Sequence, residues 1–510
     1  MPELRFGGGI NQLDDELVNA DECVEGENFQ LDSASRQFRP RDPFTLKGTA
    51  TSAEEVSGIM QLVTRADVLT TLVQTQEFLY SWDGVNSFTP VATVATNSLL
   101  RDTYWSLDDL LILTDLNKAT TVRTWNGSAI ATLTHAITGV TNLYAKYGVV
   151  FQNRLWLFNV TTDATSLPHV ILASAFEDHE NFDNANTPTS STLTASSAFF
   201  LVIPDLRPIN GVAVFFNTIV ISTVNGALFK LTGTDATDYA VVPLYPGSSA
   251  AGDESIVNTG DDVMYIRKGG NIERLISSDT YGDTETDDLS TWIRDEAENL
   301  TGGIAVYDQA HQLVLWFIGG FILVLDKNSL DSGLSPWMKW TTNMVSALDV
   351  SAAKYLRVPG TTNYSVYFGG PQGQIYDVHG SGASDAGSTL ITVYRKSKLI
   401  SELNTVDDFV SGRVHYRRKG VCNLVLDLEW SENYADSRCV VPLLGPITSG
   451  GVAFWGGGVY WGGDHYWNQG GVEEFRVSTS GFSAAGKSPS FFLTVTITST
   501  VDFLVNKIEA

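Results

Sequence analysis

The stretch Tyr80-Ser81-Trp82-Asp83-Gly84 returns 43 residues later as Arg123-Thr124-Trp125-Asn126-Gly127, each time at the end of a strand-like run. Asp-Gly and Asn-Gly are preferred in type I′ turns, because both central residues of that turn need a positive φ. Each motif therefore predicts the closing turn of a β-hairpin. Their displacement predicts a repeating unit.

Further hairpin-like units follow along the chain. They start near residues 60, 102, 144, 211, 256, 303 and 346, spaced by about 42 to 47 residues apart from one gap near 67. Four-stranded propeller blades take roughly 40–50 residues. The pattern predicts an all-β chain with a β-propeller over residues 51–380, of six or seven blades. The long gap falls on Ala175–Ser197, whose polar composition predicts an inserted surface loop.

The longest apolar stretch, Leu313 to Leu325, is far shorter than the roughly 20 residues of a membrane-spanning helix. Gly319-Gly320 divides it into two strand-length halves, which favours a hairpin. We therefore expect no stable membrane insertion. The start of the chain carries no basic, apolar signal segment, and three scattered cysteines indicate a reducing compartment.

Residues 1–50 have the composition of an extended arm. A propeller ring closes through a strand supplied by one terminus. The segment Met1–Arg41 either supplies that strand or reaches a neighbouring subunit, and the sequence leaves both open.

The character of the chain changes after Gly380, where a small, polar segment to Gly387 predicts a domain boundary. Residues 388–510 alternate apolar and polar positions, which favours an antiparallel β-sandwich-like domain. Strands are expected at Arg413–Tyr416, Cys422–Trp430, Glu473–Val477 and Phe491–Ile497.

The charge is strongly acidic, with 58 Asp and Glu against 32 Lys and Arg and a net charge of −26. Residues 1–380 hold 45 acidic and 21 basic residues, a net charge of −24. Binding to nucleic acid depends on neutralising phosphates, so this balance excludes a DNA-coating protein. With 43% apolar residues the chain can bury a large core.

Motifs of enzyme chemistry are missing from the sequence. The seven histidines show no metal-binding spacing, and there is no nucleophile elbow, phosphate loop or dinucleotide fingerprint. We expect no catalytic residues, no metal and no cofactor. Ser329 to Trp337 is a near match to the Asp-box of sialidase propellers, but its Trp lies one place late.

Two segments are candidate contact surfaces. The first is a basic concentration, which on a strand pair could face phosphates or an acidic partner subunit, and docking of a partner subunit is favoured because the surrounding chain is acidic. The second is an aromatic, Gly-rich loop that can contact protein or sugar, or fold back into the core. The residues proposed from them are Arg395, Arg413, Arg417 and Arg418, and Trp455, Tyr460 and Trp461.

The amino-terminal part of the chain contains a series of short motifs. They are Phe6-Gly7-Gly8-Gly9-Ile10-Asn11, Asp14, Ala20-Asp21-Glu22, Glu27-Asn28-Phe29-Gln30-Leu31-Asp32 and Phe38-Arg39-Pro40-Arg41. This series resembles the amino-terminal arm of a known family, the tail-hub and nozzle propellers of short-tailed bacteriophages, also called packaged-DNA stabilisation or head-stabilisation proteins. The Trp-Asp-Gly turn, the chain length, the Tyr460-Trp461-Gly462-Gly463 loop and the ending Phe491–Ile508 are also similar.

The resemblance implies a structural virion protein, assembled in the host bacterial cytoplasm as a homohexamer in the tail. Such a ring lies below the portal and adaptor, closes the channel after DNA packaging and conducts DNA at ejection. The adaptor–portal complex is the implied partner, with a tail needle or fibre as a further one, and DNA passes through the lumen without specific binding. Phe6, Gly8, Ile10 and Asn11 join the contact candidates.

Two other classes stay open. A glycan-binding propeller or glycosidase acting on host surface sugars fits the Asp-box near match and the 12 Trp residues. A glycosidase needs two carboxylates about 5–10 Å apart, one with a raised pKa. A cellular propeller scaffold that binds peptides is the third class, and it has no need of the acidic arm and carboxy-terminal domain.

Overall fold

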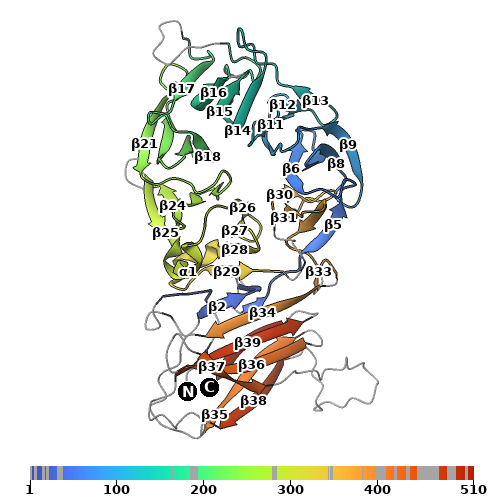
Figure 1. The fold of residues 1–510 in the computed structure, drawn as a ribbon, viewed down its shortest axis with the longest axis vertical. Coiled ribbons are helices and arrows are strands. Elements are labelled where there is room, and N and C mark those ends of the chain that lie inside the picture. The colour runs from blue at the N-terminus through green and yellow to red at the C-terminus, as the bar shows by residue number, and fades with distance from the viewer. Residues whose placement is uncertain are drawn as a thin grey trace.

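The computed structural model describes the chain except residues 1–2, 5–7, 14–17, 19–21, 32–37, 164, 184–192, 278–283, 343, 345–348, 382–383, 388, 398–408, 419–421, 432–436, 445–469, 479–489, 500–502 and 510. Side chains are described only within residues 8–396. Figure 1 shows a ring of small sheets with a second group of strands beside it, and both chain ends lie in that second group.

The ring consists of seven four-stranded antiparallel sheets, so the propeller has seven blades. The first three blades are β6 (Val56–Val63), β7 (Leu69–Thr75), β8 (Phe78–Trp82) and β9 (Phe88–Thr93); β10 (Leu100–Trp105), β11 (Leu110–Asp115), β12 (Arg123–Trp125) and β13 (Ile130–Thr132); and β14 (Leu143–Phe151), β15 (Arg154–Thr162), β16 (Thr165–Ala173) and β17 (Phe199–Val202).

The other four blades complete the ring. They are β18 (Ile209–Phe215), β19 (Thr218–Thr223), β20 (Ala227–Thr232) and β21 (Ala240–Pro246); β22 (Ile256–Asn258), β23 (Asp262–Ile266), β24 (Ile272–Ser277) and β25 (Thr284–Asp288); β26 (Ile304–Asp308), β27 (Leu313–Ile318), β28 (Phe321–Asp326) and β29 (Trp337–Trp340); and β30 (Ala353–Arg357), β31 (Tyr364–Gly369), β32 (Gln374–Asp377) and β5 (Thr45–Thr49).

The ring is closed by an amino-terminal strand. The first strand of every blade contacts that of the next, and β30 of blade 7 contacts β6 of blade 1. Strand β5 pairs with β32 and so joins the start of the chain to blade 7. The closing strand thus lies within residues 1–50 but just beyond Met1–Arg41, the segment for which the sequence left ring closure and contact with a neighbouring subunit both open.

The Trp-(Asp/Asn)-Gly motifs do close hairpins, but through longer connections than two-residue type I′ turns. β8 ends at Trp82 and β9 begins at Phe88. Asp83 caps the connection, since its Oδ1 accepts hydrogen bonds from the N–H groups of Val85, Asn86 and Ser87 at 2.9–3.1 Å. This Asx-type capping replaces the I′ geometry. Only the glycine of the motif, Gly84, has a positive φ.

Other predicted elements of the propeller lie as expected. The stretch Leu313 to Leu325 forms the hairpin β27–β28, with Gly320 at a φ of 97° in its turn. The long gap in the repeat lies between β16 and β17, and part of it is outside the described residues. Short helices follow β25 and β28: η1 (Leu289–Ile293), α1 (Arg294–Ala297) and η2 (Lys327–Ser332). Within the described chain, no helix has the length and apolarity needed to cross a bilayer.

Large aromatic side chains fill the space within and between blades, because a single sheet cannot bury both of its own faces. Each of the following is at most 2% exposed: Trp105, Trp125, Trp156, Trp316, Trp337 and Trp340. Blades 6 and 7 share one apolar core with the amino-terminal residues Ile10, Cys23 and Phe29.

The second group of strands forms two six-stranded antiparallel sheets. One contains β1 (Glu3–Leu4), β3 (Phe29–Leu31), β4 (Phe38–Pro40), β35 (Phe409–Arg418), β38 (Gly470–Ser478) and β40 (Phe503–Glu509). The other contains β2 (Cys23–Glu27), β33 (Ser384–Asp385), β34 (Thr389–Ser397), β36 (Cys422–Ser431), β37 (Ser437–Leu444) and β39 (Ser490–Ser499).

The arm is therefore built into the sandwich. Strand β2 pairs with β34, and β1 and β4 pair with β40. The four carboxy-terminal segments expected as strands all lie in strands, while β37 and β40 went unpredicted. The described strands of the arm, β1 to β4, pair with strands of their own chain.

Candidate functional site

The arm contacts blade 6 along its outer edge. The N–H of Gly9 donates to the carbonyl of Ser335 at 2.7 Å, and the N–H of Ile10 donates to the carbonyl of Trp337 at 2.8 Å. A Cβ on Gly9 would lie 2.1 Å from the Trp337 oxygen, so only glycine permits this approach. The amino-terminal segment thus extends the blade and fixes the sandwich beside it (Figure 1).

The contact candidates that the structure describes lie inside this junction. Ile10 is 2% exposed, and Asn11 is buried with its Nδ2 donating to Glu22 Oε2 at 2.6 Å. Arg395 is 1% exposed, and its guanidinium donates to the carbonyl of Gly8 at 2.8 Å. These three residues are buried against other parts of their own chain and do not form a free docking face in this subunit.

The remaining candidates lie in the carboxy-terminal strands or outside the described residues. The backbones of Arg413, Arg417 and Arg418 lie in β35, whose partners are β38 and β40. Arg395 lies in β34 of the other sheet, so the basic concentration does not share a strand pair, which corrects that expectation. Phe6, Trp455, Tyr460 and Trp461 lie outside the described residues.

A buried ion pair joins the arm to the segment after the propeller. Arg41 and Asp385 form two hydrogen bonds, of 2.9 and 2.6 Å, with side chains 0% and 1% exposed. Asp385 also accepts from the Phe44 N–H at 2.8 Å and the Thr342 hydroxyl at 2.7 Å. Arg41 gives its Nε hydrogen to Asn28 Oδ1 at 2.9 Å. We name Arg41 and Asp385 the closure pair, because they lie where the ring closes.

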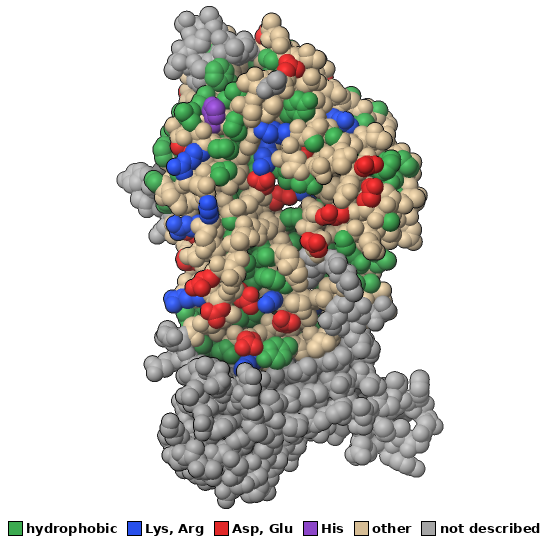
Figure 2. All heavy atoms as spheres, viewed as in Figure 1, with side chains coloured by type: hydrophobic (Ala, Val, Ile, Leu, Met, Phe, Trp, Pro, Cys, Tyr) green, Lys and Arg blue, Asp and Glu red, His purple; other side chains and the backbone are tan. Residues whose placement is uncertain are grey.

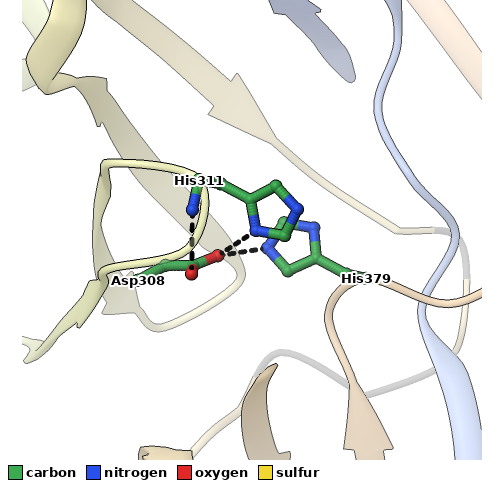
Figure 3. Close-up of side chains that lie close together, drawn as sticks. All are labelled: Asp308, His311 and His379. Carbon is green, nitrogen blue, oxygen red and sulfur yellow. Dashed lines mark hydrogen bonds and ion pairs between the residues drawn. The ribbon is translucent and has the colours of Figure 1, made fainter. Parts of the chain in front are cut away.

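Next to the closure pair is a group of four titratable side chains, Asp42, Asp308, His311 and His379, which we name the histidine cluster. Asp308 ends β26, His311 lies in the following turn, and His379 follows β32. Oδ2 of Asp308 lies 2.8 Å from His311 Nδ1 and 2.5 Å from His379 Nε2. Both imidazoles converge on this one oxygen (Figure 3).

The charges in the cluster are strongly coupled. Burial is the largest influence on His379 and opposes its charge, but hydrogen bonds to Asp308 and Asp42 outweigh it and raise the pKa to about 9. Burial likewise opposes the charge of Asp308, yet the hydrogen bonds from both histidines hold its pKa well below the usual range. His379 is therefore a cation shared between two carboxylates at neutral pH.

Three members of the histidine cluster, Asp308, His311 and His379, offer a set of metal ligands. One ligand atom from each lies within 4.8 Å of the other two. Sequence analysis missed this group, and its expectation of no metal residues rested on local spacing. His311 and His379 are 68 positions apart and meet only because the ring brings blades 6 and 7 together. Asp308-x-x-His311 was the one local signal.

Charged side chains also meet at the middle of the ring, a group we name the axial cluster. Arg101 of blade 2 forms an ion pair with Glu254, which precedes blade 5, through Nε and through Nη2 at 2.5 Å to Oε2. Arg101 also donates to the carbonyls of Ser57 and Ser351 at 2.8 and 3.0 Å. Figure 2 shows basic and acidic side chains side by side near the ring centre. The other members are Asp102, Lys146, Asp253 and Lys354.

A cavity of about 660 Å³ opens among turns of blades 4 to 6. Its lining includes Asp261, Asp262, Lys327 and Asp331, and Phe216, which is 60% exposed. Burial is the largest influence on both paired carboxyls. Burial prevails at Asp262, whose pKa is raised. At Asp261 the Lys327 hydrogen bond, a backbone hydrogen bond and the charges of Lys327 and Arg274 together outweigh burial, and the pKa is lowered. Two carboxyl groups whose pKa values are shifted in opposite directions can serve as general acid and general base.

The fold and the site define the class of this protein. It is a seven-bladed β-propeller whose amino-terminal arm connects it to a β-sandwich of the same chain. No family model and no curated protein sequence matches the chain. Similar solved structures include virginiamycin B lyase from Staphylococcus aureus, with a TM-score of 0.42, 11% identity and coverage of 65% of this chain and 96% of that one.

Two further structures are similar at the same level. The extracellular domain of a hybrid two-component system from B. thetaiotaomicron has a TM-score of 0.41 and 11% identity, covering 78% of this chain and 47% of that one. YCF48 bound to D1 peptide has a TM-score of 0.39 and 11% identity, covering 66% and 95%. Similarity at this level is confined to fold, and the propeller assignment follows from the chain's own strand pairing.

Proposed function

We propose that this chain is a structural protein of a short-tailed phage virion. It forms the homohexameric nozzle or hub ring below the portal and adaptor, closes the channel after packaging and conducts DNA at ejection. The proposal starts from the resemblance of the amino-terminal residues to that family. A ring subunit that holds back DNA must transmit force between its domains without bending.

The observation that supports the proposal best is the position of those amino-terminal residues. Gly9 and Ile10 form hydrogen bonds to blade 6, and Gly8 accepts one from Arg395 of the sandwich. The segment that carries the resemblance is thus the segment that couples propeller to sandwich. Buried contacts that leave no space for a larger side chain favour a rigid subunit.

The acidic balance agrees with a conduit for DNA. Residues 1–380 carry a net charge of −24. A negative wall repels the phosphate backbone and keeps DNA from adhering during passage. Ion pairs of the axial cluster connect blades across the centre of the propeller. In this proposal DNA therefore passes through the lumen that the six copies enclose, and not through a single propeller.

The first experiment is quantitative mass spectrometry of purified virus particles. We expect one copy of this chain for every two portal subunits, as a six-fold ring below a twelve-fold portal requires. Absence of the chain from particles would exclude the tail assignment.

A substitution in the arm tests the mechanical part of the proposal. Gly9→Ala places a methyl group against the Trp337 carbonyl, so we expect the arm to detach, with faster proteolysis near residue 9 and fewer completed tails. Gly319→Ala is the matched control, because a Cβ there meets nothing within 4 Å. Equal tail yields from both variants would show that arm docking is unnecessary for assembly.

A glycosidase or glycan-binding function at the 660 Å³ cavity is the second candidate. Two observations favour this function. The pKa of Asp262 is raised while that of Asp261 is lowered, and the Phe216 ring is exposed. Incubation with host surface glycans would then release sugars, and Asp262→Asn would abolish the release. Absence of both hydrolysis and binding removes this candidate.

A further inference from the structure

The histidine cluster presents three ligand atoms to one point. Oδ2 of Asp308, Nδ1 of His311 and Nε2 of His379 lie within 4.8 Å of one another, and the two imidazole rings stack at 3.9 Å between centroids. Figure 3 shows both ring nitrogens facing the same carboxylate oxygen. Zinc binds such atoms at about 2.0–2.2 Å. The Asp308 carboxylate would therefore have to move away from the two ring nitrogens to admit the ion.

The neighbours of these atoms hold them in place. His379 Nδ1 lies 3.1 Å from Asp42 Oδ2, the carboxylate–histidine arrangement that orients metal-bound imidazoles. Oδ1 of Asp308 accepts from the N–H groups of Ala310 and His311 at 3.0 and 3.3 Å, which leaves Oδ2 free to face the rings. The orientation of the ligands is therefore fixed by the fold before any ion arrives.

We propose that Asp308, His311 and His379 form a binding site for one divalent first-row transition metal ion, with Zn²⁺ as the fitting probe. Two imidazoles and one carboxylate suit Zn²⁺ and its neighbours in the series, whereas Mg²⁺ and Ca²⁺ prefer oxygen ligands alone. The His311 side chain is 39% exposed, which gives the ion an entry path and leaves the fourth position to water.

Binding exchanges protons for the ion. An imidazole nitrogen that ligates the ion must be without a proton, so Nε2 of His379 releases its proton to solvent, whereas Nδ1 keeps its proton and donates it to Asp42. Binding therefore releases protons, and affinity increases with pH.

Other charged groups face the cluster and enter this balance. Arg39 lies 3.7 Å from Asp42, and Asp377 accepts the backbone N–H of His379 at 3.0 Å and pairs with Lys47 at 3.2 Å. The ion would connect the β26–β27 turn of blade 6 to the end of β32 in blade 7. Metal would then lock the ring beside its closing strand, whether or not the chain serves in a phage tail.

The test is titration of the full chain, free of any histidine tag and stripped with a chelator, with Zn²⁺ by calorimetry in two buffers of different ionisation enthalpy. We expect one ion per chain, release of protons on binding, a higher thermal unfolding midpoint, and no response to Mg²⁺. Asp42→Asn should weaken binding by about 10- to 100-fold, the usual effect of losing such an orienting carboxylate.

Ligand variants decide the assignment. Asp308→Asn and His379→Gln should lose the site, and His311→Gln, at a partly exposed position, should weaken binding at least as much as Asp42→Asn while the chain stays folded. His179→Gln is the matched control, because His179 pairs with Asp108 at 3.2 Å in another blade. Binding that is absent from the folded wild-type chain, or unchanged in His311→Gln, overturns the proposal.

Discussion

Two ion pairs hold distant parts of the ring together, and they differ in how much water reaches them. The closure pair, Arg41 and Asp385, has side chains 0% and 1% exposed. Arg101 and Glu254 of the axial cluster are 21% and 24% exposed. Water can replace a lost partner at the axis but not at the closure. The comparison teaches that burial, more than the distance bridged along the chain, sets the cost of breaking each contact.

The largest effect is expected from Asp385→Ala. The substitution leaves the Arg41 guanidinium buried without its carboxylate and removes the acceptor for the Phe44 N–H. Breaking a buried pair in this way costs about 3–5 kcal/mol. Urea denaturation of the full chain measures the loss, with Asp331→Ala, at an exposed position, as control. A difference between the variants below about 1 kcal/mol would contradict the burial argument.

The next effect follows from the charge of His379, measured in the presence of a chelator. Its pKa rises from 6.5 in the unfolded chain to about 9 in the fold. The stabilisation is therefore fully present below about pH 6.5 and is lost as pH rises through 9. The difference between the pKa values corresponds to about 3 kcal/mol.

Unfolding free energies at pH 6 and at pH 9.5 test this expectation. His379→Gln cannot gain the proton, so its stability should change much less across the same interval. A wild-type curve parallel to that of His379→Gln would show that the histidine is not a shared cation. These values lie close to those of the closure pair because both groups are almost fully buried.

The repeat could be predicted from the sequence, since a blade leaves local signals. Trp82 and Trp125 mark equivalent turns. The predicted unit starts lie in or next to the first strands of blades 1 to 6, whereas the start near 346 precedes β30 (Ala353–Arg357). Each blade is a local hairpin series, so turn residues and apolar runs are sufficient to find it. The same local signals predicted the hairpins correctly. They predicted the wrong turn type, because the Asp83 side chain caps the connection.

The junction could not be predicted, because its partners are far apart in the chain. Asp385 lies in a Gly- and Ser-rich segment that resembles a linker, yet Arg41 makes it part of the core. His311 and His379 carry no spacing signal. Ile10 and Arg395 were expected at a contact surface, and the contact they make is with their own chain. The composition of a segment predicts its average exposure, but it does not identify the distant residue that a given side chain contacts.

A smaller effect is expected at the axis. The Arg101→Met and Glu254→Gln variants and their double variant form a thermodynamic cycle for a pair bound through Nη2 and Oε2 at 2.5 Å. We expect a coupling of about 1–2 kcal/mol, between surface and buried pairs, and a decrease when salt is added. A coupling equal to that of the closure pair would mean that solvent does not reach the axis.

The smallest effect separates burial from distance along the chain. Arg357 of blade 7 pairs with Asp67 of blade 1, which is 290 positions away and 68% exposed. Asp67→Asn keeps the side-chain shape, and Asn tolerates the φ of 60° at this position. We expect an unchanged denaturation midpoint, because water and ions screen an exposed pair. This pair bridges the first and last blades, and Arg41 and Asp385 join the arm to the segment after the propeller, so both pairs connect distant parts of the chain. A clear loss of stability here would therefore show that connectivity, rather than burial, makes such contacts important.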